Sequence, residues 1–363
     1  MYHKKTLWLT MLVALVMLLA LPVLSACGSE PAEPTTPTTP VTPPAAEKSE
    51  FDVVQAAADA YMSSGSKWNI KASDLYLLLN DDDTANAPYV ISARKPEHYA
   101  LGHVPGATNI GWGDLFKAET LSTIPGEGVV IYCYTGHTAS HATAVLGTLG
   151  VEVLNMKHGM SDWTQNVEVA PFRFDPATAR MDYAVETAAN AATETFDFPV
   201  LDNTASSDDR DILLAAAASY AKPRNIAAKD LYTLLNDEDK GNDPFIVSIR
   251  TAEAYAKGHV PGAINIGFTQ IAKKENLAKL PTDRPIVIYC YTGHTGSQAT
   301  ALLNLLGYDA TNLKFGMTSW TMDTEVAPGA FDNAKGNDFA YVTGTSPRSE
   351  ERRVGKECRS RWS

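Results

Sequence analysis

Two cysteines stand in surroundings that suit a reactive thiol. Cys133 directly follows the apolar segment 129–132 and precedes segment 139–149, whose alanines and leucines predict a helix. Four residues, one of them a glycine, separate Cys133 from Thr138, near which we expect the helix to begin. A tight loop at a helix N-terminus points backbone N–H groups inward, and such a cradle stabilises a thiolate. Because the thiolate is the nucleophilic form of cysteine, the pattern predicts covalent chemistry on sulfur.

The same arrangement occurs a second time in the chain. Residues 130–138, Val-Ile-Tyr-Cys-Tyr-Thr-Gly-His-Thr, return unchanged as residues 287–295, which places Cys290 in an identical loop. The alternative interpretation is that both cysteines are small buried side chains at strand ends. Two unchanged copies inside repeats that differ at many other positions favour function. We therefore predict that Cys133 and Cys290 are catalytic and that the loop residues bind the substrate, namely Tyr134, Thr135, Gly136, His137, Thr138, Tyr291, Thr292, Gly293, His294 and Thr295.

The two loops belong to a repeat of whole-domain size. Residues 102–107 also return unchanged, as residues 258–263, with a period of 156–157 residues. Solenoid units have only ~20–50 residues, so this period indicates a duplicated domain. We expect one domain over residues 49–185 and a second over 207–345, joined by a linker over 186–206 that is rich in Ala, Thr and Asp.

Each repeat alternates short apolar segments with segments of helical periodicity. Uninterrupted apolar strands are typical of a parallel sheet that is covered on both faces. The predicted fold is therefore α/β, with two domains that each contain a small, mostly parallel sheet and helices on both faces. The expected strands are 89–91, 129–132, 151–154, 245–247, 286–289 and 310–313, and the main expected helices are 51–62, 139–149, 212–221 and 297–306.

These motifs together resemble the rhodanese-like domain. The resemblance covers both repeats. It includes the six-residue loop counted from each cysteine, with glycine fourth and threonine sixth, and a closing glycine–tryptophan element at Gly159 and Trp163 and again at Gly316 and Trp320. The signature of the family's N-terminal half is matched by Ala93, Arg94, Glu97, Tyr99 and residues 102–107 in the first repeat, and by Arg250, Glu253, Tyr255 and residues 258–263 in the second.

The resemblance implies sulfurtransferase chemistry. Cysteine would take the outer sulfur of a small donor such as thiosulfate as a persulfide and pass it to an acceptor such as cyanide or a thiol. Thr138 and Thr295 would cap the helices after the loops, and supporting ion pairs would join Arg94 to Glu97 and Arg250 to Glu253. No cofactor is implied, and the spacing of Cys and His fits no metal motif. Phosphatases of the superfamily carry an arginine in a longer loop, and neither loop here contains arginine.

Two departures from the family leave a second interpretation open. Ser92 and Ser248 stand where the family usually has aspartate, and the loops lack its usual Arg or Lys. His137 and His294 would supply charge only when protonated. A non-catalytic module that binds a sulfur compound or a protein partner is therefore the alternative function. A redox pair of the two loop cysteines is disfavoured, because a disulfide needs Cα atoms within ~7 Å and the two lie in separate domains.

The ends of the chain predict export and a lipid anchor. Two lysines, an apolar run and small residues make residues 1–26 a secretory signal peptide, with an uncleaved transmembrane helix as the alternative. Leu-Ser-Ala-Cys ending at Cys27 resembles a bacterial lipobox, so we expect lipidation of Cys27 and a membrane contact through it. Residues 27–48 form a Pro/Thr-rich tether, and the basic segment 346–363 is expected to be a disordered, artefactual tail.

The composition bears on partners and location. The net charge of −12 opposes binding to nucleic acid. With a lipid-anchored N-terminus, the expected location is the outer face of the cytoplasmic membrane or the periplasm.

Overall fold

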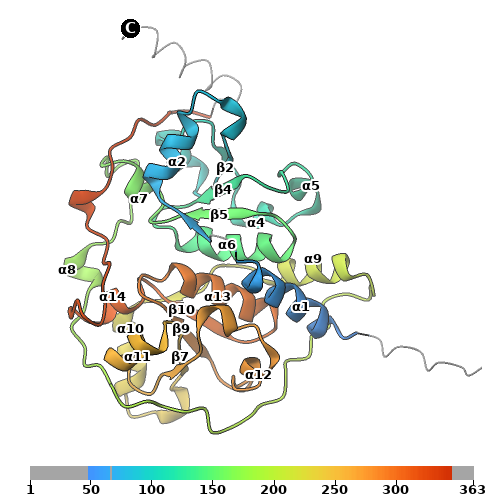
Figure 1. Ribbon diagram of the computed structural model, residues 1–363, viewed down its shortest axis with the longest axis vertical. Helices are drawn as coiled ribbons and strands as arrows, with labels where there is room; N and C mark the ends of the chain where they lie inside the picture. Colours follow the sequence, from blue (N-terminus) through green and yellow to red (C-terminus); the bar gives the residue numbers. More distant parts are fainter. Residues whose placement is uncertain (1–47, 66–67, 346–363) are drawn as a thin grey trace, which may run out of the picture. The chain divides into compact units, whose positions relative to one another are not determined.

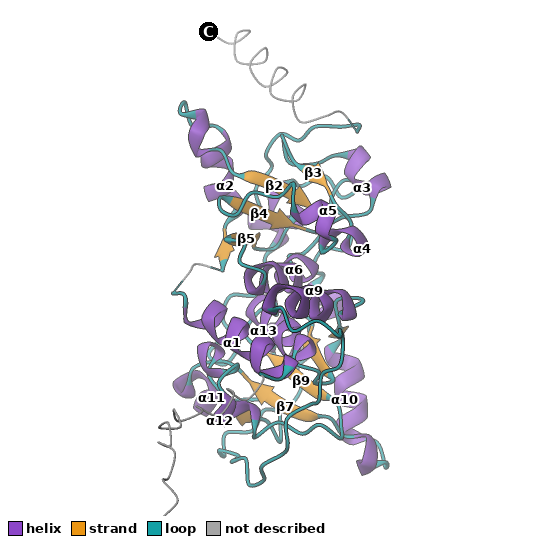
Figure 2. Ribbon diagram, turned by 90° about the vertical axis from the view of Figure 1, so that its right-hand side faces the viewer, coloured by secondary structure: helices purple, strands orange, loops and turns teal. Residues whose placement is uncertain are grey.

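The computed structural model describes residues 48–65 and 68–345. The predicted signal peptide, the predicted lipidation site Cys27, nearly all of the predicted tether and the predicted tail lie outside the described residues. Figures 1 and 2 show two domains of the same design, each built on one five-stranded sheet with helices on both sides. All strand pairs within the two sheets are parallel. The predicted α/β fold, with two domains that each contain a parallel sheet between helices, is confirmed.

The strands of the two sheets correspond one to one. The order is β1-β5-β4-β2-β3 in the first sheet and β6-β10-β9-β7-β8 in the second. In both, the strand before the cysteine is central and entirely buried. The strands are β1 (Asn69–Ile70), β2 (Tyr89–Ser92), β3 (Thr108–Asn109), β4 (Val129–Tyr132), β5 (Val153–Met156), β6 (Asn225–Ile226), β7 (Phe245–Ser248), β8 (Ile264–Asn265), β9 (Ile286–Tyr289) and β10 (Ala310–Leu313).

The helices of the first domain include one that begins inside the cysteine loop. They are α1 (Glu50–Ser63), α2 (Ala72–Leu79), α3 (Pro96–Leu101), α4 (Trp112–Leu115), α5 (Ala118–Leu121), α6 (His137–Thr148) and α7 (Met160–Trp163), followed by α8 (Pro176–Ala179) in the connection. The second domain repeats the pattern with α9 (Asp209–Ser219), α10 (Ala228–Asn236), α11 (Ala252–Lys257), α12 (Lys274–Leu277), α13 (His294–Leu305) and α14 (Met317–Trp320).

The predicted elements agree with the structure except at some boundaries. β4 and β9 span the predicted residues. β5 begins at Val153 rather than at Val151, because the Val151 N–H still closes the end of α6 by donating to the Leu146 carbonyl (3.0 Å). Gly150, at φ 84°, makes that turn, since the left-handed region carries no steric cost for glycine.

The two cysteine helices pack against each other between the two sheets. Figures 1 and 2 both place α6 and α13 side by side there. One continuous apolar cluster runs through both domains and includes both loop cysteines. Burial of apolar surface is the main favourable term in folding, so a shared core couples the stability of the domains.

Each domain is completed by a segment from the other half of the chain. After α8 the chain pairs with the second domain, where the Tyr183 N–H donates to the Trp320 carbonyl (2.9 Å). The last described segment, red in Figure 1, returns to the first domain, where the Phe339 N–H donates to the Trp163 carbonyl (2.8 Å). The sequence repeats were expected to end at residues 185 and 345. The segments that lead up to these residues pack on the domain formed by the other repeat.

The helices at the start of each repeat also contact the other domain. The Gln55 side chain of α1 donates to the carbonyl of Ala272 in the second domain (2.8 Å). The C-cap of α9, Tyr220, carries a hydroxyl 2.9 Å from Nδ1 of His141 on α6. Among residues 48–65 and 68–345, no helix is long and apolar enough to span a bilayer.

Candidate active site

The predicted cysteine loops lie at the carboxyl ends of the central strands. Cys133 follows the last residue of β4, and α6 begins four residues later at His137. The N-cap of α6 is Gly136 with φ 84°, and the N-cap of α13 is Gly293 with the same φ. The predicted caps Thr138 and Thr295 are therefore wrong. The left-handed glycine turns the chain so sharply that each helix is capped two residues earlier than predicted, and each threonine lies in the first turn.

The thiol of Cys290 is held by main-chain amides. Its Sγ accepts hydrogen bonds from the N–H groups of Gly293 (3.1 Å) and Gly296 (3.3 Å). No hydrogen bond to Sγ of Cys133 is found among the described residues. Cys133 is 2% exposed and Cys290 is 6% exposed, and both are free thiols. The second loop thus shows the cradle that the sequence predicts for both.

A glycine behind each loop allows a close approach of two backbone segments. The N–H of Met160 donates to the Cys133 carbonyl (2.9 Å), and the N–H of Met317 donates to the Cys290 carbonyl (2.9 Å). A Cβ on the preceding Gly159 would lie 2.5 Å from that Cys133 oxygen, which no side chain tolerates. The glycine–tryptophan element therefore buttresses the loop from behind.

The fifth residue of each loop reaches into the other domain. Nε2 of His137 lies 3.1 Å from the Thr292 carbonyl oxygen, and Nε2 of His294 lies 3.1 Å from the Thr135 carbonyl oxygen. The two imidazole rings stack with centroids 5.0 Å apart and planes 12° from parallel. The two loops, expected to lie apart in separate domains, are thus in direct contact.

Both histidines are neutral. Burial, followed by the charge of Lys314, lowers the pKa of His137 to about 3, and burial lowers the pKa of His294 well below its usual value. Nε2 of His137 lies between the Thr292 carbonyl oxygen (3.1 Å) and the Phe315 N–H (3.3 Å), and Nδ1 lies 3.0 Å from the Thr135 hydroxyl. Because a carbonyl oxygen only accepts, the contact with Thr292 requires the Nε2–H tautomer, in which Nε2 cannot also accept from Phe315. A second proton would sit on a buried ring with no carboxylate among its described contacts. These histidines therefore do not supply positive charge at neutral pH.

The two signature arginines do not form the predicted ion pairs. The Arg94 guanidinium is buried and donates to the carbonyl oxygens of Val169 (2.7 Å) and Gly102, while Glu97 is exposed beside Lys95. Arg250 likewise donates to Val326 (3.0 Å) and Gly258 (2.5 Å), and its predicted partner Glu253 is exposed. The arginines tie the strand ends to neighbouring loops through carbonyl groups.

The aromatic loop residues lie over these arginines. The Arg94 guanidinium is 5.8 Å from the ring centroid of Tyr134, and that of Arg250 is 5.4 Å from the ring centroid of Tyr291. The Tyr134 hydroxyl also accepts from the Lys95 N–H (3.1 Å). Such cation–π contacts fix the outer side of each loop.

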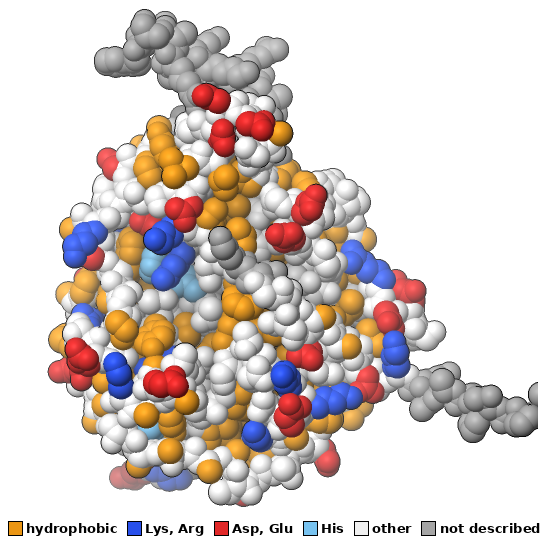
Figure 3. Space-filling view, in the orientation of Figure 1, with side chains coloured by type: hydrophobic (Ala, Val, Ile, Leu, Met, Phe, Trp, Pro, Cys, Tyr) orange, Lys and Arg blue, Asp and Glu red, His pale blue; other side chains and the backbone are white. Residues whose placement is uncertain are grey.

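Two lysines that sequence reasoning missed lie beside the contact between the loops. Lys157 and Lys314 follow β5 and β10 at equivalent positions, and both are half-buried. Nζ of Lys314 lies 5.2 Å from the Phe315 ring, which in turn packs 4.8 Å from the His137 ring. Figure 3 shows Lys and Arg side chains beside histidine on the face that carries α7. Comparison of the repeats would have found the shared Lys-X-Gly pattern, though not its position.

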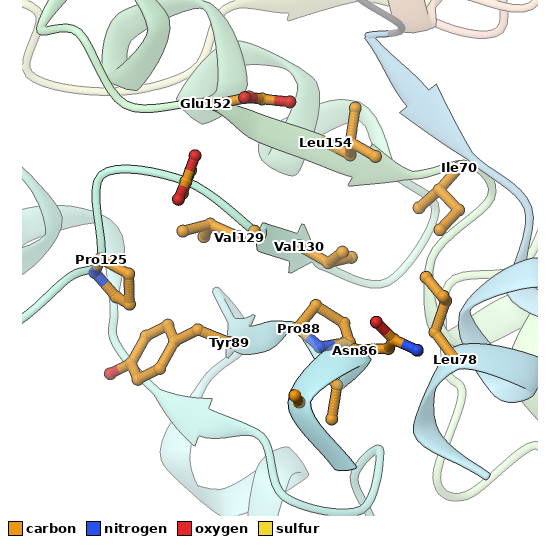
Figure 4. A pocket seen from close by; sticks show the side chains of 14 residues that line it. Ile70, Leu78, Asn86, Pro88, Tyr89, Pro125, Val129, Val130, Glu152 and Leu154 are labelled. Atoms are coloured by element: carbon orange, nitrogen blue, oxygen red, sulfur yellow. The ribbon is translucent and has the colours of Figure 1, made fainter. Parts of the chain in front are cut away.

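One pocket among the described residues lies away from the cysteine loops. It has a volume of ≈ 510 Å³ and is lined by Tyr89 and Val129, the first residues of β2 and β4, together with Ile70 and Glu152 (Figure 4). Cys133 lies at the other end of β4. Within the described part of the chain, no cluster of three or more His, Cys, Asp or Glu side chains forms a metal site.

Comparison with known proteins identifies the family. Residues 71–166 and 227–323, together more than half of the chain, match the model of the rhodanese-like domain. The chain therefore belongs to the rhodanese-like domain family, with one domain in each repeat.

Several relatives are sulfurtransferases by name. The chain is 27% identical over 227 residues to the probable adenylyltransferase/sulfurtransferase MoeZ of Mycobacterium tuberculosis. The matched region covers 62% of this chain and 48% of that protein. It is 33% identical over 87 residues to the thiosulfate sulfurtransferase GlpE of Pseudomonas fluorescens. That match covers 23% of this chain and 78% of that protein. The chain thus spans about half the length of the first relative.

One of the solved structures that match the chain covers about a quarter of it. The rhodanese-like domain protein of Staphylococcus aureus is 28% identical, with a TM-score of 0.25, and the match covers 27% of this chain and 90% of that chain.

Proposed function

We propose that the protein is a sulfurtransferase that carries sulfane sulfur as a persulfide on Cys133 and Cys290. The thiolate attacks the outer sulfur of thiosulfate, the sulfur–sulfur bond of the donor breaks, and sulfite leaves with the bonding electrons. Cyanide or a thiolate then attacks the outer sulfur of the persulfide and regenerates the cysteine thiolate. Neither step needs an oxidant or a cofactor, and the division into two displacements is covalent catalysis.

One observation carries this proposal. The amides of Gly293 and Gly296 both donate to Sγ of Cys290 at the start of α13. Amide donors and the N-terminal end of a helix favour negative charge on the sulfur. The same donors are available to the outer sulfur of a persulfide, which is also an anion.

Two lysines beside the loops support an anionic donor, because no other positive charge among the described residues of the site is available to it. The loops contain no cation, the histidines are neutral, and the arginines are bound to carbonyl oxygens. Lys157 and Lys314 form no ion pair within 4.0 Å among the described residues, so their charges are available to a donor such as thiosulfate.

The test compares cyanide-dependent release of thiocyanate from thiosulfate in the wild type and in a Cys133→Ser/Cys290→Ser variant. We expect turnover in the wild type and none in the variant. Equal rates in the two proteins would exclude the proposal.

The burial of both thiols favours one competing function, a non-catalytic module that binds a sulfur compound or a protein partner. This alternative predicts binding of thiosulfate by the wild type without release of sulfite. Calorimetry together with a sulfite assay separates the two functions.

We further propose that the protein is exported and held at the membrane by a lipid on Cys27. The lipobox-like sequence is the support, and it lies outside the described residues. Labelling with an alkyne fatty acid should mark the wild type and leave a Cys27→Ala variant unmarked. Equal labelling of both would exclude the anchor.

A further inference from the structure

The reciprocal histidine contacts end on equivalent peptide groups of the two cysteine loops. The carbonyl of Thr292, which accepts from His137, is bonded to the nitrogen of Gly293. The N–H of that same planar peptide unit donates to Sγ of Cys290 (3.1 Å). His137 of the first domain thus holds one end of the peptide whose other end holds the sulfur of the second domain.

The first loop has the same histidine contact in reverse, although no hydrogen bond to Sγ of Cys133 is found among the described residues. Nε2 of His294 lies 3.1 Å from the Thr135 carbonyl oxygen, and that carbonyl is bonded to the nitrogen of Gly136. Gly136 is the equivalent of Gly293 and has the same φ of 84°. The contact is therefore a paired feature of the two loops, not an accident of one.

The surrounding backbone is shaped for this contact. A Cβ on Gly293 would lie 2.6 Å from Nε2 of His137, and one on Gly136 would lie 2.8 Å from Nε2 of His294. His158 and Phe315 adopt φ of 63° and 62°, a region that is costly for such residues, and their N–H groups lie 3.2 Å from Nε2 of His294 and 3.3 Å from Nε2 of His137. These are the same two atoms that face the carbonyl oxygens, and the Nε2–H tautomer satisfies the carbonyls rather than the two N–H groups.

An imidazole that donates to a carbonyl acts on the whole peptide group. It restricts rotation of the peptide plane, and it polarises the N–H at the other end because linked hydrogen bonds strengthen one another. Both effects favour the anionic sulfur that the Gly293 amide faces. Burial makes the interaction stronger than it would be in water, since His137 and Thr292 are 3% and 9% exposed.

We propose that His137 is a positioning residue for Cys290 and that His294 is a positioning residue for Cys133. Each sulfur site is completed by the histidine of the other domain, so neither repeat forms a full site alone. This inference rests on the proposed sulfur transfer.

The test measures a reaction at one cysteine after a change in the other loop. In a Cys133→Ser background, where only Cys290 reacts, His137→Ala should slow persulfide formation from thiosulfate by about tenfold or more, since small errors of placement are costly. His137→Gln, whose side-chain amide can donate to Thr292, should recover most of that loss. The mirror experiment uses His294 in a Cys290→Ser background.

The chain offers a matched control on the same helix. His141 of α6 is also buried and also bonds across the domain contact, to the Tyr220 hydroxyl, without touching a loop peptide. His141→Ala should lower the thermal midpoint while leaving the Cys290 rate within about twofold of the background. A Cys290 rate that falls equally in the His137→Ala and His141→Ala variants, or that His137→Gln does not restore, would overturn the proposal.

Two further measurements test the proposal if His137→Ala does not fold or if the protein shows no turnover. If His137→Ala does not fold, Thr135→Val removes the hydroxyl at Nδ1 of His137, and an unchanged Cys290 rate would then overturn the proposal. The proton chemical shift of the Gly293 amide, read in isotope-labelled protein, needs no turnover. It should move in His137→Ala and return in His137→Gln, and an unmoved shift would refute positioning. Absence of any persulfide in the Cys133→Ser background, despite a shift that moves, would instead refute the proposed function at Cys290.

Discussion

His137 and His294 stack across the contact between the two domains, with ring centroids 5.0 Å apart and planes 12° from parallel. Each ring comes from the active-site loop of its own domain. The pair is flanked by Phe315 on one side and His158 on the other, at 4.8 Å in both cases. The two candidate sites therefore share one buried junction, and the predictions below depend on its charge, protonation and amide donors.

Cys290 should react faster than Cys133. Only Cys290 shows amide donors to Sγ among the described residues, and it is slightly more exposed, 6% against 2%. Alkylation by iodoacetamide at pH 7, followed by peptide mass spectrometry, should modify Cys290 several-fold faster. The single variants Cys133→Ser and Cys290→Ser provide the matched controls. Faster modification of Cys133 would contradict the assignment of the better-formed cradle to the second loop.

Removal of the charge at Lys314 should weaken binding of an anionic donor more than removal of that at Lys157. Asp162 acts electrostatically on Lys157, whereas Ser319 occupies the equivalent place near Lys314. We expect Lys314→Gln to raise KM for thiosulfate about three- to fivefold, as a half-exposed charge contributes up to about 1 kcal/mol. The control is Lys117→Gln, because that exposed lysine pairs with Asp114 at 2.6 Å, far from the loops in sequence. Equal KM values for Lys314→Gln and Lys117→Gln would count against a donor site beside Lys314.

Stability should fall as the pH is lowered below about 6.5. Burial lowers the pKa of His137, His141 and His158 to about 3 in the folded protein. The unfolded chain takes up protons near pH 6.5 and the folded chain does not, so their contribution is complete above that pH and is lost progressively toward pH 3. Each such histidine lowers the unfolding free energy by at most about 1.4 kcal/mol per pH unit.

The variant His158→Phe tests this pH dependence directly. Phenylalanine already occupies the equivalent position 315 with the same backbone conformation, so the change is matched within the chain. Urea denaturation between pH 6.5 and 5 gives the unfolding free energy at each pH. Its slope against pH should be smaller in the variant than in the wild type, by an amount that approaches one proton toward pH 5. A slope that does not change would mean that His158 is protonated in the folded state.

Ser92→Asp should stabilise the first domain. The Arg94 guanidinium is buried without a carboxylate, and both its Nε and the Ser92 hydroxyl have no hydrogen-bond partner among the described residues. A carboxylate there would form charge-assisted hydrogen bonds of about 1.5–3 kcal/mol. Ser248→Asp should gain less, because the Ser248 hydroxyl already accepts from Arg250 Nε at 3.4 Å. Thermal denaturation of the two variants measures both changes in stability. A lower midpoint for Ser92→Asp than for the wild type would show that the space beside Arg94 does not accommodate a carboxylate.

The sequence predicts features that depend on local pattern. The apolar runs at β4 and β9 and the repeated loop identify the central strands and both cysteines, because strand burial and glycine turns leave a clear signal. The Arg94–Glu97 pair was wrong because spacing along a chain does not show which carbonyl groups surround a buried guanidinium. Thr138 was expected to cap α6, but the conformation of Gly136 decides where that helix starts.

Contacts between the repeats leave little trace in either repeat alone. Nothing about His137 indicates that its partner is the Thr292 carbonyl, which is far away in sequence and offers only a backbone atom. The exchange of segments after Trp163 and Trp320 is likewise a property of the packing of the two halves. Such features follow from the pairing of two domains and need the three-dimensional structure.

The most direct test of the account is the mass of the two loop peptides after the protein has been incubated with thiosulfate and the excess removed. We predict that the peptides containing Cys133 and Cys290 each gain the mass of one sulfur atom and that cyanide removes it from both. Peptides that keep their original mass at both cysteines, in folded protein, would contradict the account.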